Sequence, residues 1–331
     1  PLMISIVSLA LTRPSVPRRD ALQLLTAAGA SLVPSPLIAA PSYAASIKLA
    51  DGLDFPLASF GLQQYDDATA ERLTRLAIDA GFRNFFASTL AGNQRGFARG
   101  VEASGIARSE LFICGSVVSN RALDADTAYK LTKLGCDENL EAFAVGGIDT
   151  LDMIMLDYPG PGCDCIRGQW RAFEEMHASG RTKSLAVSNF VPAQLDCILK
   201  DPKLKTKPTV NQLPYCVGYH DTGVIPANRR RGIHVQAWSP LGNGRLTRFS
   251  RDKAKAKEVC SEVGAAYGKS AYQVALRFIT QMGASYTVEA RSPEHFQENL
   301  KIFDFELSKD DITRLESLNV QVTYEGAITQ G

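Results

Sequence analysis

The sequence has almost no surplus charge of either sign and few residues of the kinds that build metal sites. Its 331 residues carry 36 Lys and Arg against 35 Asp and Glu, a formal net charge of +1. This balance gives no excess of basic residues that could bind the phosphates of a nucleic acid, so we expect no nucleic-acid partner. There are only four histidines, and the cysteines show no spacing typical of a zinc site, so we expect no metal.

The cysteines number seven and lie far apart, except for Cys163 and Cys165. An odd count leaves at least one thiol free or paired with another molecule. Whether Cys163 and Cys165 form a disulfide with each other stays open at this point.

The first 46 residues differ in composition from the rest, and Asp20 is their only acid. The pair Arg18-Arg19, an apolar run and the small residues that end at Ala44 resemble a twin-arginine export signal that is cleaved before Ala45. Two prolines in the second half of the apolar run argue against a membrane span, and we expect none in the mature chain. We therefore expect residues 1–46 to be a targeting segment and 47–331 to be the folded domain. An ordinary disordered extension is the alternative.

The same signal indicates the compartment to which the protein is exported. Because the chain begins with Pro1 rather than methionine, we expect a fragment of a longer precursor. A transit peptide before the signal would direct the protein to a chloroplast and then to the thylakoid lumen, which we favour. A bacterial periplasm is the alternative.

The segment Gly180–Phe190 indicates the fold class. Its apolar run ends at Val187 and is followed by the polar pair Ser188-Asn189, which is typical of a buried strand with two hydrogen-bonding side chains at its carboxyl end. In a parallel α/β barrel, ligands bind at that end of the strands. Ser188 and Asn189 are therefore candidate binding residues, although capping of the next helix is an alternative role.

Other segments support a barrel of this type. Length and a hydrophobic content of 45% fit a single α/β barrel. Ile47–Pro56 alternates apolar and polar residues around Asp51-Gly52, which predicts a β-hairpin before the first barrel strand. Asp149–Pro159 is expected to form the fourth strand and Gln169–Ala178 the fourth helix.

Several motifs occur in the order and spacing of the aldo-keto reductases, and the resemblance covers Ile47–Leu318. The matching segments are Gly81–Gln94 (GFRNFFASTLAGNQ), Glu110–Val117 (ELFICGSV), Trp170–Met176 (WRAFEEM), Val210–Gln212 (VNQ) and Gln236–Gly242 (QAWSPLG). The resemblance implies a (β/α)8 or TIM barrel, of the α/β class, with an N-terminal β-hairpin. It also implies a site for a nicotinamide dinucleotide, NAD or NADP, at the carboxyl ends of the strands.

The resemblance further implies which residues hold this cofactor. Ser188, Asn189 and Gln212 correspond to the residues that bind the nicotinamide amide. Trp238 stands where a tyrosine normally stacks on the nicotinamide ring, and simple core packing is its alternative role. The other positions implied for the cofactor are Ser239, Leu241, Glu298 and Asn299.

The catalytic residues of the family are absent from this chain. In the matched register, the aspartate, tyrosine, lysine and histidine of the family are replaced by Phe86, Ala91, Ser116 and Asp157. The family reaction needs a tyrosine that donates a proton to the carbonyl oxygen while the lysine lowers its pKa and the histidine orients the substrate. General acid catalysis contributes about 10² to 10⁴ in rate, so we expect carbonyl reduction to be impaired.

The position that binds the 2′-phosphate of NADPH is also changed. Glu289 stands where the family has a lysine. A carboxylate repels the 2′-phosphate but accepts a hydrogen bond from a free 2′-hydroxyl. If either dinucleotide binds, we expect NADH to be favoured over NADPH.

Three functions are consistent with these residues. The first is a catalytically impaired protein that acts by binding a dinucleotide. The second is an active NAD(P)H-dependent oxidoreductase in which Asp157, Ser116 or Tyr158 supplies the proton. The third is a structural or assembly subunit of an exported complex, with a protein partner. No residue pattern identifies the substrate.

Overall fold

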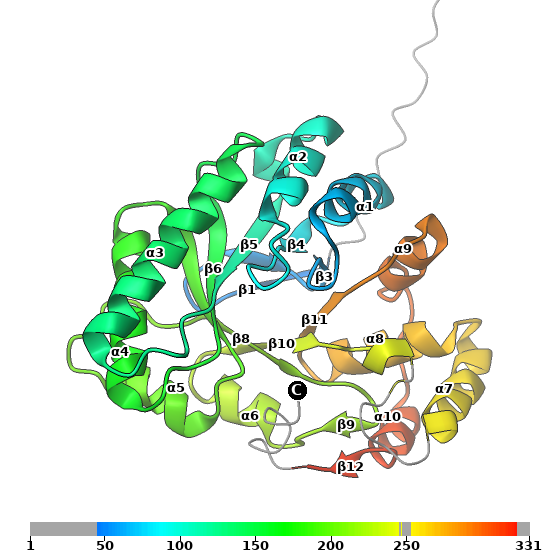
Figure 1. Cartoon of the computed structure of the whole chain (residues 1–331). Coiled ribbons are helices and arrows are strands. Elements are labelled where there is room, and N and C mark those ends of the chain that lie inside the picture. Colours follow the sequence, from blue (N-terminus) through cyan, green and yellow to red (C-terminus); the bar gives the residue numbers. More distant parts are fainter. Residues whose placement is uncertain (1–44, 245, 247–252, 323–331) are drawn as a thin grey trace, which may run out of the picture. The chain divides into compact units, whose positions relative to one another are not determined.

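Eight parallel strands close into a barrel, and helices surround it (Figure 1). Around the barrel the strands run in the order β10, β11, β3, β4, β5, β6, β7, β8. The barrel strands are β3 (Ala58–Gly61), β4 (Asn84–Phe86), β5 (Phe112–Val117), β6 (Leu151–Asp157), β7 (Thr182–Ser188), β8 (Val210–Pro214), β10 (His234–Trp238) and β11 (Ser285–Val288). The closed parallel sheet confirms the predicted TIM barrel.

The computed structural model describes residues 45–244, 246 and 253–322. These residues all belong to one compact unit of the chain, Ala40–Gly331. The predicted twin-arginine segment lies almost wholly outside the described residues. Among the residues that are described, no helix combines the length and apolar character needed to cross a membrane.

The helices follow the strands along the chain. They are α1 (Asp67–Ala80), α2 (Gln94–Ser104), α3 (Ala125–Ala144), α4 (Cys163–Ala178), α5 (Pro192–Leu199), α6 (Val224–Arg229), α7 (Lys253–Tyr267), α8 (Ala271–Gln281), α9 (Pro293–Leu300) and α10 (Lys309–Glu316). Short elements are the 3₁₀ turns η1 (Arg108–Glu110) and η2 (Gly242–Gly244) and the strands β9 (Tyr219–His220) and β12 (Val320–Gln321), which pair with each other. The fourth barrel helix, α4, begins at Cys163 rather than at Gln169 as expected.

Side-chain caps fix where several helices begin. Asp66 accepts a hydrogen bond from the backbone N–H of Thr69 at 2.7 Å at the start of α1. Asp124 accepts one from Thr127 at 2.8 Å at the start of α3. Each cap satisfies a backbone donor that has no partner within its helix, which stabilises the helix by about 1 kcal/mol.

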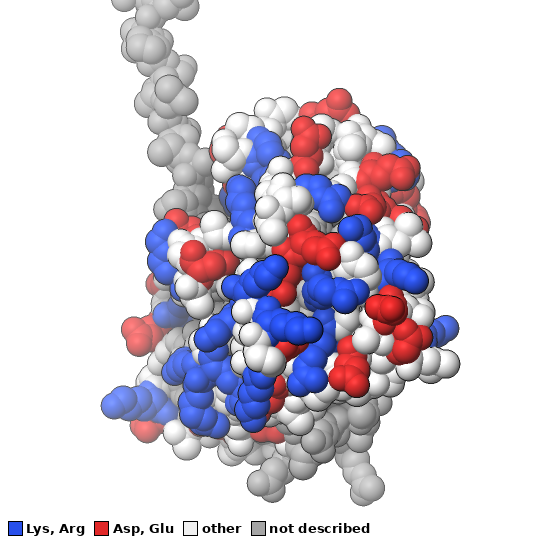
Figure 2. All heavy atoms as spheres, turned by 90° about the vertical axis from the view of Figure 1, so that its left-hand side faces the viewer, with Lys and Arg blue, Asp and Glu red and all other residues white. Residues whose placement is uncertain are grey.

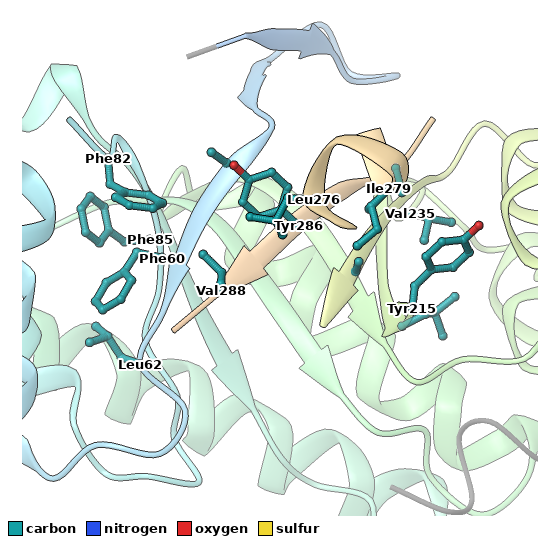
Figure 3. Packing of buried hydrophobic residues seen from close by; sticks show 14 of the residues in the cluster. Phe60, Leu62, Phe82, Phe85, Tyr215, Val235, Leu276, Ile279, Tyr286 and Val288 are labelled. Atoms are coloured by element: carbon teal, nitrogen blue, oxygen red, sulfur yellow. The ribbon is translucent and has the colours of Figure 1, made fainter. Parts of the chain in front are cut away.

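Two apolar layers hold the barrel together. The outer layer lies between strands and helices, and Figure 3 shows part of it, with Phe60, Phe82 and Phe85 grouped on one side. The ring centroids of Phe60 and Phe82 are 5.8 Å apart, and those of Phe60 and Phe85 are 6.3 Å apart. These distances are typical of favourable aromatic pairs.

The inner layer fills the barrel below its carboxyl end. Its residues alternate along the strands with those of the outer layer, as the period of two requires. The predicted hairpin is confirmed: β1 (Ser46–Lys48) pairs antiparallel with β2 (Asp54–Pro56). Leu49 and Phe55 of this hairpin pack in the inner cluster with Phe86, Phe112, Cys114, Met153, Met155, Ala186 and Val210. The hairpin therefore closes the barrel end opposite to the site described below.

A disulfide links two neighbouring helices on the outside of the barrel. Cys163, at the start of α4, pairs with Cys197 in α5, and their Cα atoms are 5.1 Å apart. Cys165 is buried and free, so the possible pairing of Cys163 with Cys165 is excluded. The bridge ties together the helices that follow β6 and β7.

Charges of both signs are spread over the face that carries α3, α4 and α5 (Figure 2). Some of them form ion pairs between helices, such as Lys133 with Glu175 at 3.1 Å and Arg181 with Asp137 at 2.6 Å. Exposed pairs of this kind stabilise a protein by about 0.2–1 kcal/mol each. This face therefore contributes solubility more than stability.

Candidate functional site

A cavity of about 550 Å³ opens at the carboxyl ends of the barrel strands. This is the end of the barrel at which ligands bind in proteins of this fold. Twelve of the positions singled out in the sequence line the cavity: Phe86, Asp157, Tyr158, Ser188, Asn189, Gln212, Trp238, Ser239, Leu241, Glu289, Glu298 and Asn299. Positions that are far apart in the sequence are thus brought together at one site.

The polar residues at the ends of β6, β7 and β10 form one hydrogen-bond network. Asn189 donates from Nδ2 to Asp157 Oδ1 at 3.2 Å and to Ser188 Oγ at 3.0 Å. Trp238 donates from Nε1 to Asn189 Oδ1 at 3.1 Å. The amide of Asn189 is therefore fixed in one orientation by neighbours on both sides.

Gln212 lies next to this network on β8. Its Nε2 donates to Oε1 of Gln236 at 2.8 Å, and its backbone carbonyl accepts a hydrogen bond from the N–H of Asn189 at 3.0 Å. The barrel register sets Asp157, Ser188 and Gln212 side by side on successive strands. Ser188, Asn189 and Gln212, the three residues expected at the nicotinamide amide, are thus adjacent.

Four non-glycine residues that line the cavity have left-handed backbone conformations; one is Asn243 (φ 56°), and the other three follow barrel strands. These three are Tyr158 (φ 70°), Asn189 (φ 64°) and Ser239 (φ 50°), each directly after the last residue of β6, β7 or β10. A bulky residue such as tyrosine rarely adopts a positive φ, and strained backbone of this kind clusters at functional sites. The strain helps to turn these three side chains toward the cavity that they line.

Asp157 is the most deeply buried acid of the cavity, with an exposed fraction of 4%. Burial raises its pKa to about 6, while hydrogen bonds from Ser188 and Asn189 oppose that rise. Its partners are neutral, and no ion pair joins it to any cation among the described residues. Above pH 6 the site therefore holds a buried negative charge that no positive group in the described chain compensates.

The other three positions at which the sequence register predicts a replaced catalytic residue offer no proton at the cavity. Phe86 is apolar and lines its wall. Ser116 is fully buried outside the lining, where its Oγ accepts a hydrogen bond from the N–H of Thr89 at 3.3 Å. Ala91 lies in the turn between β4 and α2, also outside the lining.

The far end of the cavity is lined by Glu289, His295, Glu298 and Asn299. The Glu289 side chain is exposed, but partial desolvation by the surrounding walls raises its pKa to about 7, and Arg291 opposes the rise. Glu298 accepts a short hydrogen bond from Ser270. Glu289, Glu298 and Asn299 are positions that the resemblance implies for the cofactor, and the structure places them together with His295 at this end of the cavity.

Sequence reasoning missed several residues of the lining. They are Gln63, Gln64, Asn243, Gly244, Tyr272 and Thr287. Gln63 and Gln64 follow the carboxyl end of β3, so the rule that identified Ser188 and Asn189 also indicates them. Tyr272 comes from α8, and no signal in the sequence places its side chain at the cavity.

Two details of the wall fit a bound organic molecule. The Oγ1 atom of Thr287 is buried and has no hydrogen-bond partner in the described part of the chain. Gly61 also lines the cavity, and a Cβ atom at this position would come within 2.8 Å of Thr287 Oγ1. A polar atom left available and a wall with little side chain are both typical of a binding site.

Comparisons with known proteins agree with this geometry. Residues 56–320 match the model of the aldo/keto reductase family. The glyoxal reductase of Bacillus subtilis (strain 168) is 30% identical over 275 residues, which cover 83% of this chain and 92% of that protein. An aldo-keto reductase of Mycolicibacterium smegmatis is 28% identical over 272 residues, 82% of this chain and 92% of the relative.

Solved structures show the same fold. The aldo/keto reductase of Brucella melitensis superposes with a TM-score of 0.72 at 27% identity, covering 83% of this chain and 99% of that one. The aldo-keto reductase MGS-M4 from a deep-sea metagenome superposes with a TM-score of 0.74 at 22% identity and supports the fold alone. With the family model matched over most of the barrel, this chain belongs to the aldo/keto reductase family, whose members generally bind NAD(P)H.

Proposed function

We propose that this protein binds a nicotinamide dinucleotide in the barrel cavity and that its capacity to reduce carbonyl compounds is impaired. The observation that carries the proposal is the composition of one wall. Ser188, Asn189, Gln212 and Trp238 adjoin one another at the cavity, while the slot of the family tyrosine is an alanine outside it. The site thus retains groups that recognise a nicotinamide and lacks the group that protonates a carbonyl oxygen.

Each residue has a separate task in this proposal. Gln212 and the Ser188–Asn189 pair would hold the nicotinamide amide, and Trp238 offers an aromatic face for the ring. Glu298 and Asn299 would hold the adenine, with Ser239 and Leu241 between the two ends. A bound reduced dinucleotide supplies a hydride. The side chains of this chain bind and orient it and exclude water around it.

NADH is the proposed partner rather than NADPH. The 2′-phosphate of NADPH would approach Glu289, and two negative charges repel each other. Among the described residues that line the cavity there is no lysine or arginine, and Arg291, which acts on Glu289 from outside the lining, offsets only part of this repulsion. A free 2′-hydroxyl can instead donate a hydrogen bond to the carboxylate.

The test combines binding and turnover. NADH is titrated into the purified protein while tryptophan fluorescence is followed, and Trp238→Phe serves to assign the signal. Saturable quenching that this variant loses supports the site. Glyoxal, named as a substrate for one relative, is then offered with each dinucleotide. Reduction of glyoxal well above background would contradict the proposal that carbonyl reduction is impaired.

A second candidate function is an oxidoreductase with a rebuilt proton donor. Asp157 favours it, because a carboxyl with a pKa of about 6 at the cavity carries a proton in a useful fraction of molecules near neutral pH. The decisive variant is Asp157→Asn, which retains the shape and removes the titrating proton. Loss of a measurable carbonyl turnover in this variant would favour the second function over the first.

We also propose export to an oxidising compartment, with the thylakoid lumen favoured over a bacterial periplasm. The Cys163–Cys197 bridge supports this proposal, because disulfides persist mainly outside the reducing cytosol. Fusion of residues 1–46 to a reporter in a strain with and without the twin-arginine translocase tests it. A reporter that stays in the cytosol of the competent strain would contradict it.

A further inference from the structure

The charges that line the cavity are one-sided. Asp157, Glu289 and Glu298 contribute three carboxyl groups, and no lysine or arginine lies among the described lining residues. Glu289 and Glu298 belong to the adenosine end. Asp157 alone lies beside the nicotinamide-binding network, to which it is joined through Asn189 at 3.2 Å.

The cavity that Asp157 lines also has aromatic walls. Phe86, Tyr158 and Trp238 line the same cavity. Tyr158 is the next residue in the chain, and Trp238 is separated from Asp157 by the single side chain of Asn189. Aromatic faces attract organic cations, and a desolvated contact of this kind contributes about 2 kcal/mol.

A buried carboxylate normally has a positive partner. Ser188 and Asn189 give Asp157 hydrogen bonds but no charge, and no ion pair to it occurs in the described part of the chain. Asp157 is shielded from bulk solvent and faces only the cavity. A ligand that carries a positive charge would therefore compensate the negative charge of its carboxylate. A carboxylate and aromatic side chains in one cavity are a usual pattern for recognising such cations, and Phe86 and Tyr158 remain for the cation when Trp238 faces the nicotinamide ring.

We propose that the Asp157 end of the cavity binds an organic ammonium or iminium ion, and that the substrate class of this protein is a cyclic or aromatic iminium rather than a carbonyl. The assignment of a substrate rests on the proposed binding of a dinucleotide. The binding of the cation does not, because Asp157 and the aromatic side chains are present in the free protein.

The chemistry accounts for the loss of the tyrosine. An iminium carbon that accepts a hydride from a reduced dinucleotide gains one C–H bond, while the electron pair of the C=N bond moves to nitrogen. The iminium is reduced, the dinucleotide is oxidised, and a neutral amine forms without a proton donor. A carbonyl treated in the same way becomes an alkoxide, which needs a proton and which the carboxylate of Asp157 would repel.

Asp157 acts here as a binding residue that selects charge. It lowers the energy of the bound cation and so favours the protonated form of an imine over the free base. It does not assist the hydride transfer, because its attraction for the ligand is lost as the positive charge disappears and the neutral amine forms. Its contribution is therefore expected in affinity and specificity.

The experiment compares two ligands of the same bicyclic shape on the dinucleotide-free protein. N-methyl-dihydroisoquinolinium is permanently cationic, and tetralone is its neutral carbonyl counterpart. Calorimetric titration is expected to show the cation binding at least about tenfold more tightly, which corresponds to about 1.4 kcal/mol. Equal affinities, or tighter binding of tetralone, would overturn the proposal.

Two variants locate the effect. Asp157→Asn is expected to weaken the binding of the cation about tenfold or more and to affect the binding of tetralone much less. Asp164→Asn is the matched control, because it makes the same change at an exposed position, with 88% of the side chain accessible, outside the cavity. An unchanged affinity in Asp157→Asn, or an equal loss in both variants, would refute the assignment. If Asp157→Asn does not fold, the comparison of the two ligands on the unmodified protein decides.

NADH separates this proposal from the proposed function. Saturating NADH is expected to leave the cation bound, and displacement would place the cation in the nicotinamide position and overturn the substrate assignment. If NADH binds and the cation does not, the cation proposal fails and dinucleotide binding stands. If the cation binds and no dinucleotide does, the cation site stands while the substrate assignment fails with the proposed function.

Discussion

The carboxylate of Glu289 is expected to weaken the binding of NADPH relative to NADH. The size of this effect can be calculated, and lowering the pH removes it by protonating the carboxylate. Two unit charges 4 Å apart interact by roughly 4 kcal/mol at an effective dielectric constant of about 20. Glu289 is open to the water of the cavity, and a Debye length of about 8 Å at physiological salt screens part of this energy. We therefore expect the carboxylate to weaken NADPH binding by about 1–2 kcal/mol, or about 5- to 30-fold.

The pH dependence follows from the raised pKa of Glu289, about 7. At pH 8 about nine-tenths of the carboxyl groups are charged, and at pH 6 about one-tenth are. The repulsion of the 2′-phosphate is thus present at pH 8 and is lost as the pH falls through 7. Protonation of the 2′-phosphate, whose own pKa is about 6, occurs equally in Glu289→Gln, which serves as the control.

The assay is a set of dissociation constants for NADH and NADPH at pH 6, 7 and 8 in the native protein, Glu289→Gln and Glu289→Lys. The preference of the native protein for NADH is expected to grow with pH, and that of Glu289→Gln to change less. Glu289→Lys is expected to narrow or invert the preference, and added salt to shrink its effect. Tighter binding of NADPH by the native protein, or identical ratios in native protein and Glu289→Gln at pH 8, would refute the placement of Glu289.

Three further predictions concern stability and folding. Asp157→Asn is expected to stabilise the protein at pH 8 by about 2–3 kcal/mol and hardly at pH 4, as measured by denaturant unfolding. The reason is that the native pKa of Asp157 is raised from 3.8 to about 6, so the penalty for its charge is absent below 3.8 and complete above 6. An equal effect at both pH values would contradict this. Reduction of the Cys163–Cys197 bridge, which spans 34 residues, is expected to lower the free energy of unfolding by about 2–4 kcal/mol. The double variant Cys163→Ser/Cys197→Ser should be insensitive to reductant, and a response to reductant in it would point to another thiol. A chain of residues 47–331 is expected to fold and melt cooperatively, because the barrel strands and helices lie within it; an insoluble or molten product would contradict that.

The sequence predicts the barrel and several residues of its cavity because parallel strands that end in polar residues leave a local pattern. A buried strand that ends in polar residues identifies Ser188 and Asn189, whereas Gln212, in the middle of β8, is indicated only by the resemblance to the aldo-keto reductases. Parallel strands bring their carboxyl ends together, so residues far apart in the sequence can be placed at one cavity without a structure.

Other features depend on contacts that no local pattern encodes. The partner of Cys163 is Cys197, 34 residues away, and only the packing of α4 against α5 selects it over the nearer Cys165. The start of α4 is missed although Cys165 and Ile166 of its first turn are buried, because these two residues alone do not establish a helical period before Gln169. The raised pKa values of Asp157 and Glu289 depend on burial within the assembled cavity, which the sequence alone does not give.

The most direct test of the proposed function is a calorimetric titration of the native protein with NADH and NADPH at pH 8, repeated with Gln212→Leu. The account predicts one NADH site per chain, weaker binding of NADPH, and loss of NADH affinity in the variant because the amide of the nicotinamide then faces an apolar side chain. Absence of heat and of tryptophan quenching with either dinucleotide at millimolar concentration would contradict the account.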